Sequence, residues 1–271
     1  MRNSIIYESQ YGFRQGHSTI HAVSEFIENV IDGFDKREST LAVFLDLSKA
    51  FDTIDHNILL QKLKFYGIRG NAFDWFTSYL SHRVQYVALE DYNSDRYFIK
   101  CGVPQGSVLG PLLFLIYIND LPKNLSHCKS ILFADDANIF RKSKHLSELF
   151  NLVNEDLKLV ADWFNSNRLS LNIAKTHYVI FKPNKQKIPD LQILIESTPI
   201  DCKQCIKFLG ILIDNQLSWK PHVDYVKGRL TSALFALRRM KSNTSTHNSL
   251  TVYYSLFHSH MNYGLILGRN N

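Results

Sequence analysis

The sequence contains no apolar run long enough to cross a bilayer. Its longest one, residues 108–118, includes Gly110 and Pro111 and is shorter than the ~20 residues that a spanning helix needs. Residues 1–6 also lack the apolar core of a secretory signal. We therefore expect an intracellular protein without a membrane segment.

Cysteine is scarce, and its spacing is not that of a zinc site. Of the 4 cysteines, Cys202 and Cys205 form a single C-x-x-C pair without a second pair at a suitable distance. A structural zinc site needs four sulfur or nitrogen ligands, and a reducing compartment disfavours disulfides. We expect neither a structural zinc ion nor a disulfide framework.

Acidic residues are almost absent from the C-terminal segment, residues 215–271. Asp224 is the one acid there, so this segment carries the whole net charge of +6. Clustered basic residues attract phosphate backbones, because binding releases condensed counterions; a solvated helix face is the alternative reading of the same charge. The basic residues of the segment are Lys220, Lys227, Arg229, Arg238, Arg239, Lys241 and Arg269.

The spacing of apolar residues predicts a mixture of helices and strands. Helices are expected over residues 54–66, 71–82 with Asn71 as N-cap, 109–118 and 145–167, and again after Trp219. Strands are expected over residues 41–45, 84–89, 96–101, 176–181 and 208–213, with 84–89 and 96–101 forming a hairpin around a turn at 91–95. Residues 182–190 are the most loop-like stretch, and the charge changes near Asn215.

Three acidic residues stand at the ends of apolar runs. Asp135 and Asp136 lie between Ile131-Leu132 and Ile139-Phe140, which predicts a β-hairpin with two carboxylates at its tip, and Asp46 ends the run 41–45. Adjacent carboxylates repel each other, so a bound cation would explain the arrangement. Oxygen ligands suit Mg²⁺, and two such ions are a common device in phosphoryl transfer. The pattern therefore indicates a two-metal site.

The residues around these acids resemble a known family. Residues 45–52 (LDLSKAFD), 102–111 (GVPQGSVLGP) and 133–136 (FADD) occur in the order of successive motifs of reverse transcriptases. The resemblance is closest to the enzymes of non-LTR (LINE-type, jockey-like) retrotransposons and covers roughly residues 11–264. Further matches lie at residues 11–19 (YGFRQGHST), which look like a fingers motif, and at 171–176 (LNIAKT) and 208–210 (FLG), which look like later palm motifs.

This resemblance implies an α+β fold, the right-hand palm of a polymerase, in which an antiparallel sheet packs on helices. Residues 1–214 would form partial fingers and the palm, and residues 215–271 a helical, basic and truncated thumb. The implied function is an RNA-directed DNA polymerase that transfers nucleotides from dNTPs to a primer 3′-end on an RNA template. Its partners would be the RNA template, the DNA primer and dNTPs, within a polyprotein that adds an upstream endonuclease and further C-terminal regions.

The resemblance also assigns roles to individual residues. Asp46, Asp135 and Asp136 would be catalytic and would hold two Mg²⁺ ions, with Mn²⁺ as an alternative. Phe51 would exclude a 2′-hydroxyl, and Lys175 would protonate the departing pyrophosphate. The nucleotide-binding set is Arg14, Lys49, Phe51, Gln105, Gly106 and Lys175, and the primer-binding set is Phe208, Leu209 and Gly210.

Simpler readings compete with several of these assignments. Phe51 is also compatible with a core position, Lys49 and Lys175 with solvated surface, and Gln105-Gly106 with a plain turn. At the level of function, the rivals are a catalytically silent nucleic-acid-binding fragment and a group II intron-type reverse transcriptase. The family resemblance implies the nucleus as the place of action, with the cytoplasm as the alternative.

Overall fold

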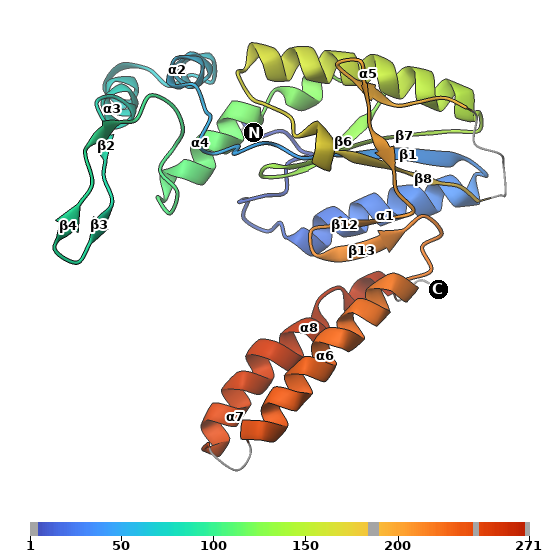
Figure 1. The fold of residues 1–271 in the computed structure, drawn as a ribbon. Coiled ribbons are helices and arrows are strands. Elements are labelled where there is room, and N and C mark those ends of the chain that lie inside the picture. The colour runs from blue at the N-terminus through green and yellow to red at the C-terminus, as the bar shows by residue number, and fades with distance from the viewer. Residues whose placement is uncertain (1–4, 184–189, 241–243, 269–271) are drawn as a thin grey trace.

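The computed structural model describes residues 5–183, 190–240 and 244–268. Its centre is a five-stranded sheet in the order β11-β8-β1-β7-β6 (Figure 1). The strands are β1 (Ser39–Leu45), β6 (Lys129–Phe133), β7 (Asp136–Ser143), β8 (His177–Phe181) and β11 (Asp201–Cys202). All neighbours pair antiparallel except β11, which is parallel to β8.

Strand β1 is the middle of the sheet, and all 7 of its residues are buried. Successive side chains of a strand point to opposite faces. Leu41, Val43 and Leu45 accordingly join the core on one face, while Ala42 and Phe44 join the core on the other. A strand that is apolar on both faces reads as a continuous apolar run, which is why residues 41–45 could be recognised in the sequence.

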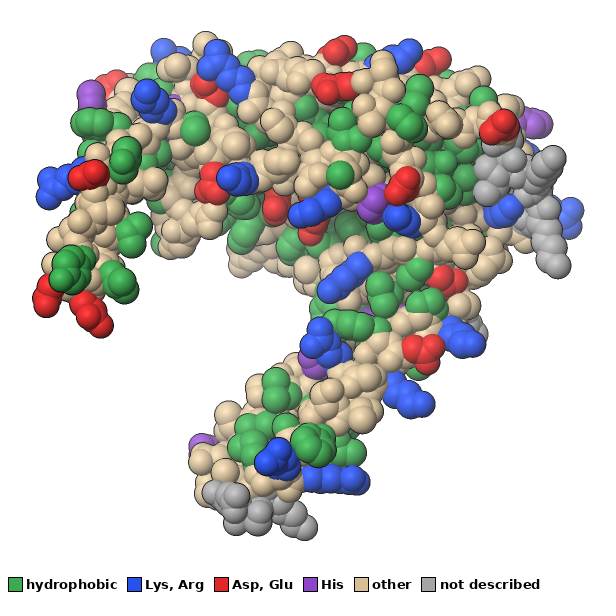
Figure 2. Space-filling view, in the orientation of Figure 1, with side chains coloured by type: hydrophobic (Ala, Val, Ile, Leu, Met, Phe, Trp, Pro, Cys, Tyr) green, Lys and Arg blue, Asp and Glu red, His purple; other side chains and the backbone are tan. Residues whose placement is uncertain are grey.

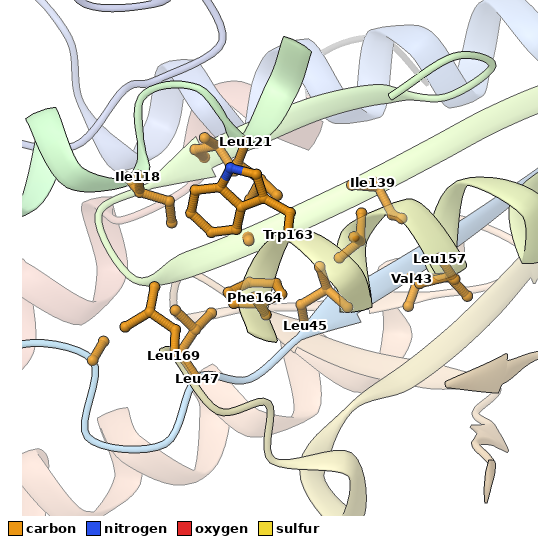
Figure 3. Close-up of a cluster of buried hydrophobic side chains, with 14 of the residues drawn as sticks. Val43, Leu45, Leu47, Ile118, Leu121, Ile139, Leu157, Trp163, Phe164 and Leu169 are labelled. Carbon is orange, nitrogen blue, oxygen red and sulfur yellow. The ribbon is translucent and has the colours of Figure 1, made fainter. Parts of the chain in front are cut away.

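Helices cover both faces of the sheet (Figure 1). On one face α5 (Leu146–Ser166) brings Phe164 beside Leu45 and Leu157 beside Val43, as Figure 3 shows, and α4 (Leu109–Ile118) extends the same core. These two helices confirm the predictions over 145–167 and 109–118.

On the opposite face α1 (Thr19–Asp35) inserts Phe26 among aromatic rings. The Phe26 ring makes edge-on contacts with Phe44, Phe140, Phe181 and Phe208 at centroid distances of 5.5 to 6.0 Å. Edge-to-face pairs of this kind add stability beyond the area that they bury. The expected antiparallel sheet packed on helices is therefore observed.

A second group of elements extends from one side of the sheet (Figure 1). It consists of α2 (His56–Phe65), α3 (Gly70–Leu80), β2 (Val84–Gln85), β3 (Ala88–Leu89), β4 (Tyr92–Asn93) and β5 (Tyr97–Phe98). The predicted hairpin is present, since β2 pairs with β5 and β3 with β4. Its turn lies at Glu90-Asp91, earlier than expected. The predicted N-cap Asn71 is wrong, because the helix begins at Gly70 and Arg69 is the N-cap.

The prediction of one strand over residues 208–213 is wrong. The chain forms a hairpin of β12 (Cys205–Phe208) and β13 (Ile211–Asp214) instead. Leu209 and Gly210, with φ of +45° and +86°, reverse the chain between them. Phe208, Ile211 and Ile213 are buried in the core that α1 covers, so this hairpin is fixed to the sheet.

After the hairpin the chain forms an arm of helices that projects from the sheet (Figure 1). The arm consists of α6 (Lys220–Met240), α7 (Thr246–Val252), η3 (Tyr253–His258), α8 (Ser259–Asn262) and η4 (Leu265–Gly268). It begins at Asp214, whose carboxylate accepts hydrogen bonds from the backbone of Gln216, Ser218 and Trp219. The helix expected after Trp219 is confirmed.

The remaining elements are short. They are η1 (Leu121–Asn124), η2 (Ile173–Lys175), β9 (Leu194–Ile195) and β10 (Thr198–Pro199). Residues 184–189 of the predicted loop 182–190 lie outside the described residues, as do Lys241 and Arg269 of the basic segment. Among the helices that the structure describes, none has the length and apolar character required to cross a membrane.

Candidate active site

The turn between β6 and β7 presents two acidic residues to solvent. Phe133 pairs with Asp136, so Ala134 and Asp135 alone form the turn, and Ala134 has a φ of +55°. Asp136 is the first residue of β7. Both residues are exposed when the whole residue is considered, although the Asp136 carboxyl itself is partly desolvated. The predicted hairpin is therefore present, with Asp135 at its tip and Asp136 at the start of the second strand.

Asp46 reaches the same place from β1. Leu45 pairs with Ala137, and one further step along this antiparallel register sets Asp46 opposite Asp136. The backbone of Asp46 is held on both sides: its N–H donates to Thr176 Oγ1 at 3.2 Å, and its carbonyl accepts from the N–H of Asn172 at 2.8 Å. Asp46 and Asp136 line one cavity of about 100 Å³ together with Lys175 and Lys207.

The three carboxylates form one electrostatic unit. Loss of solvation, followed by repulsion from Asp135 and Asp46, raises the pKa of Asp136 to about 6. Each neighbour can exert this effect only at short range. A bound cation would relieve the repulsion that Asp136 meets from its two acidic neighbours.

Asp136→Asn is expected to stabilise the protein at pH 7.5 in the absence of divalent ions. Because the folded-state pKa of about 6 exceeds the ordinary value of 3.8, the folded state binds the proton more tightly than the unfolded state. The free energy of unfolding therefore falls as pH rises between these values. After a discount for the solvent exposure of the group, the gain is about 1 kcal/mol, or ~2–4 °C in melting temperature.

The measurement is thermal unfolding at pH 7.5 and pH 4.5, where the gain should shrink. Asp162→Asn is the control, since Asp162 is an exposed residue of α5. An Asp136→Asn protein that melts no higher than the wild type at pH 7.5 would contradict the repulsion.

The turn is fixed by Gln10, a residue that the sequence analysis missed. Gln10 is 1% exposed, and its Oε1 accepts hydrogen bonds from the N–H of Gly12 at 2.7 Å and of Ala134 at 3.1 Å. The backbone on either side of Gln10 also pairs with the free edge of β6. The N–H of Leu132 donates to the carbonyl of Ser9, and the N–H of Tyr11 donates to the carbonyl of Leu132. Gln10 stands just before the motif 11–19, and its residue type alone gave no signal of this role.

Gly12 lies directly against the turn. A Cβ at this position would be 2.3 Å from the backbone nitrogen of Ala134, which is closer than a non-bonded carbon can approach. The absence of a side chain at Gly12 thus permits the N-terminal segment to support the carboxylate turn.

The segments 45–52 and 102–111 meet at Phe51 and Asp52. Their backbones are joined where Val103 donates to Phe51, and their side chains where Gln105 Nε2 donates to Asp52 Oδ1 at 2.8 Å. The half-buried Phe51 ring stacks on Phe114 of α4, with centroids 4.5 Å apart. The predicted nucleotide residues Phe51 and Gln105 are therefore close in space.

Lys49 and Gly106 lie in turns of these two segments. Lys49 is exposed with φ +50°, and Gly106 is exposed with φ +80° and open space around it. Their roles as nucleotide contacts stay predictions.

Arg14 is engaged within its own loop. Its Nη1 donates to the carbonyls of Tyr7, Glu8 and Gln10. The contact with a triphosphate that was expected of Arg14 stays a prediction, and in this structure the side chain holds the N-terminal segment together.

Lys175 and the predicted primer residues border the carboxylate cavity. Lys175, the last residue of η2, lines the same cavity as Asp46, and Phe208 forms part of the cavity wall. Leu209 and Gly210 make the tip of the β12–β13 hairpin, where the Tyr263 hydroxyl donates to the Leu209 carbonyl. Two further residues, Lys207 and Thr176, belong to this site beyond those predicted; each lies beside or within a motif already recognised.

The donor set fits a hard divalent cation. Among the residues that the structure describes, no group of three or more His, Cys, Asp or Glu side chains is arranged to hold a metal ion on its own. Mg²⁺, however, is commonly held by one or two carboxylates together with substrate phosphates. Asp46 and Asp136 share a cavity, so these residues match that incomplete type of site.

The sheet, its covering helices and the carboxylates on adjacent strands define a polymerase palm. Two telomerase structures share the fold. The apo enzyme from Candida tropicalis is 13% identical with a TM-score of 0.53, over 77% of this chain and 36% of the other. The enzyme from Candida albicans, in complex with a fragment of telomeric RNA, is 15% identical with a TM-score of 0.50, over 90% of this chain and 49% of the other.

The chain belongs to the reverse transcriptase family. The family model described as reverse transcriptase (RNA-dependent DNA polymerase) matches residues 1–213. The chain is 30% identical over 264 residues to the probable RNA-directed DNA polymerase from transposon X-element of Drosophila melanogaster, covering 95% of this chain and 29% of the relative. It is 32% identical to the corresponding protein from transposon BS of the same organism, covering 89% of this chain and 27% of the relative.

These relatives confirm the resemblance to enzymes of non-LTR retrotransposons. The chain spans less than a third of the length of either relative.

Proposed function

We propose that this protein catalyses RNA-directed DNA synthesis from a primer 3′-end. The main support is the register that sets Asp46 opposite Asp136, beside the Asp135 turn. The 3′-oxygen of the primer attacks the α-phosphorus of a dNTP, a phosphodiester bond forms, and the bond to pyrophosphate breaks. Phosphoryl transfer requires chiefly positioning and charge stabilisation, which suits carboxylates at rigid strand ends.

The divalent ions of this family would be two Mg²⁺, or Mn²⁺, held by Asp46, Asp135 and Asp136. When bound, they neutralise the charge that develops on the phosphoryl oxygens. The chain's own groups do the rest. The exposed Lys175 lines the same cavity as Asp46 and would supply a proton to the leaving pyrophosphate, while Lys49 and Arg14 would contact the triphosphate.

Residues 1–214 would act as partial fingers and palm, and residues 215–271 as a thumb. Figure 2 shows several basic side chains along the arm of α6 to η4. The arm and the β12–β13 hairpin, with Phe208, Leu209 and Gly210 at its tip, would hold the RNA template and the DNA primer. The relatives are longer than this chain, and we propose, from the family resemblance, that the chain acts within a polyprotein with an endonuclease and further C-terminal regions, in the nucleus.

Primer extension tests this function. The protein is incubated with Mg²⁺, dNTPs and a DNA primer on an RNA template, and parallel reactions contain EDTA or no template. Extension that requires both metal and template is expected. Duplex binding without any extension would instead identify a silent nucleic-acid-binding fragment.

Phe51→Val is expected to admit ribonucleotides. The ring stacks on Phe114, which limits its movement, and in the proposed role it would meet the 2′-hydroxyl of an incoming ribonucleotide. Shortening the side chain removes that clash, so the preference for dNTP over rNTP should fall by roughly 10²-fold, since a steric mismatch is worth ~1–3 kcal/mol. Single-nucleotide incorporation kinetics with dCTP and CTP measure the ratio, and an unchanged ratio would remove Phe51 from sugar selection.

Binding of the primer–template duplex is expected to weaken steeply with salt. The arm carries five described basic residues, Lys220, Lys227, Arg229, Arg238 and Arg239. If about five phosphates are neutralised, affinity falls on the order of 10²–10³-fold between 50 and 200 mM salt. Removing Arg238 and Arg239 together should flatten the slope by about two phosphate equivalents, whereas Lys158→Ala on α5 should not. Fluorescence anisotropy measures both, and identical slopes would exclude the arm as the binding surface.

A further inference from the structure

A large aromatic side chain stands exposed beside the carboxylate turn. Phe13 is 60% exposed, although it follows Gly12, which lies against the backbone of Ala134. This ring contributes little to the buried core. Phe13 directly follows Gly12, which lies against the residue before Asp135, and this makes the ring a candidate for contact with substrate.

The backbone at Phe13 is unfavourable for a bulky residue. Its φ is +53°, in the left-handed region that glycine and asparagine tolerate best. Burial does not compensate for this conformation, because most of the ring faces solvent. Non-glycine residues held in this region concentrate at ligand-binding and catalytic sites.

The loop that carries Phe13 is firmly held on both sides. Before it, Gln10 Oε1 accepts from the N–H of Gly12. After it, Arg14 Nη1 donates to three backbone carbonyls, and His17 packs edge-on against Tyr11 with centroids 5.3 Å apart. An exposed ring on such a preorganised loop is a stacking platform for a nucleotide.

The ligand follows from the geometry of the reaction. The primer 3′-oxygen must reach the carboxylates at Asp135 and Asp46, so the nucleotide that lies over the Ala134-Asp135 turn is the last one of the primer. We propose that Phe13 packs against this terminal primer nucleotide and holds it for attack. The proposal rests on the proposed polymerase function. An apolar ring contact is independent of base identity, as a primer contact must be.

Site-specific cross-linking tests the contact itself. Phe13→p-benzoylphenylalanine is irradiated with a primer–template duplex in Ca²⁺, without dNTPs, and the cross-linked nucleotide is mapped. We expect attachment to the terminal primer nucleotide. The same substitution at Phe65, which is 77% exposed on α2, should give none. Cross-links confined to the template strand, or to protein, would overturn the proposal.

Kinetics provide the second readout. Phe13→Ala should raise the KM for primer–template about 10-fold and leave the KM for dNTP unchanged, while Phe13→Trp should restore the wild-type value. Phe13→Gly should behave like Phe13→Ala despite its more favourable backbone, and neither should lower the melting temperature. Loss of stability without a change in KM would overturn the proposal in favour of a structural role. Cross-linking does not require turnover, so it still decides this contact if the wild type fails to extend a primer.

Discussion

Asp135→Asn is expected to lower the rate of nucleotide incorporation on the order of 10³-fold. Asp135 occupies the tip of a two-residue turn, and within the described part of the chain its carboxylate makes no hydrogen bond or salt bridge. Asparagine keeps the shape and removes the charge that a divalent ion requires, and a metal contributes several kcal/mol to a phosphoryl-transfer transition state. Single-turnover primer extension measures the rate.

The variant should otherwise resemble the wild type. Its melting temperature and its affinity for primer–template should be unchanged or slightly increased, because one of three repelling charges is gone. Asp162→Asn on α5 is the control for loss of an exposed carboxylate. Equal rates for Asp135→Asn and wild type would refute the metal-binding assignment.

Gly12→Ala is expected to reduce incorporation about 10²-fold through a displacement of the turn. The new Cβ would lie 2.3 Å from the nitrogen of Ala134, so the turn, the N-terminal segment or both must move. Misplacement of a catalytic group by ~1 Å can cost about 10²-fold in rate, and overpacking of this kind costs ~1–3 kcal/mol in stability. The effect should appear in kcat, because the carboxylates are displaced and the basic arm is not.

Gly228→Ala is the matched control. Gly228 is a helical residue of α6 with open space around its Cα, so alanine there should stabilise the helix by about 1 kcal/mol. Thermal unfolding and extension kinetics on both variants make the comparison. A Gly12→Ala protein with wild-type rate and stability would show that the turn does not depend on this contact.

Sequence patterns predicted the elements whose signal is local. The run 41–45 predicted β1 correctly, because a strand that is buried on both faces is a continuous apolar run. The spacing over 145–167 predicted α5 correctly, because a helix that is buried on one face has apolar residues at three- and four-residue steps. The prediction of a single strand over residues 208–213 was wrong, because two apolar strands follow each other there and only the short turn Leu209-Gly210 separates them. The prediction of Asn71 as the N-cap was wrong, because the helix begins one residue earlier, at Gly70.

The site was predictable where family motifs mark it and not where long-range contacts build it. Asp46, Asp135 and Asp136 stand in motifs, and the structure places Asp46 opposite Asp136. Gln10 supports the same turn from 124 residues away in the chain, and one glutamine gives no pattern. Lys207 reaches the cavity only through the β12–β13 hairpin, whose fold was mispredicted.

The sheet order has a consequence for synthesis on the ribosome. Strand β1 pairs with β7 and β8, and both follow it by more than ninety residues. At ~5–20 residues per second, a nascent chain therefore exposes this fully buried central strand for several seconds before either neighbour emerges. Such an unpaired strand is prone to aggregation, so the yield of folded protein should depend on chaperones that shield β1 during translation.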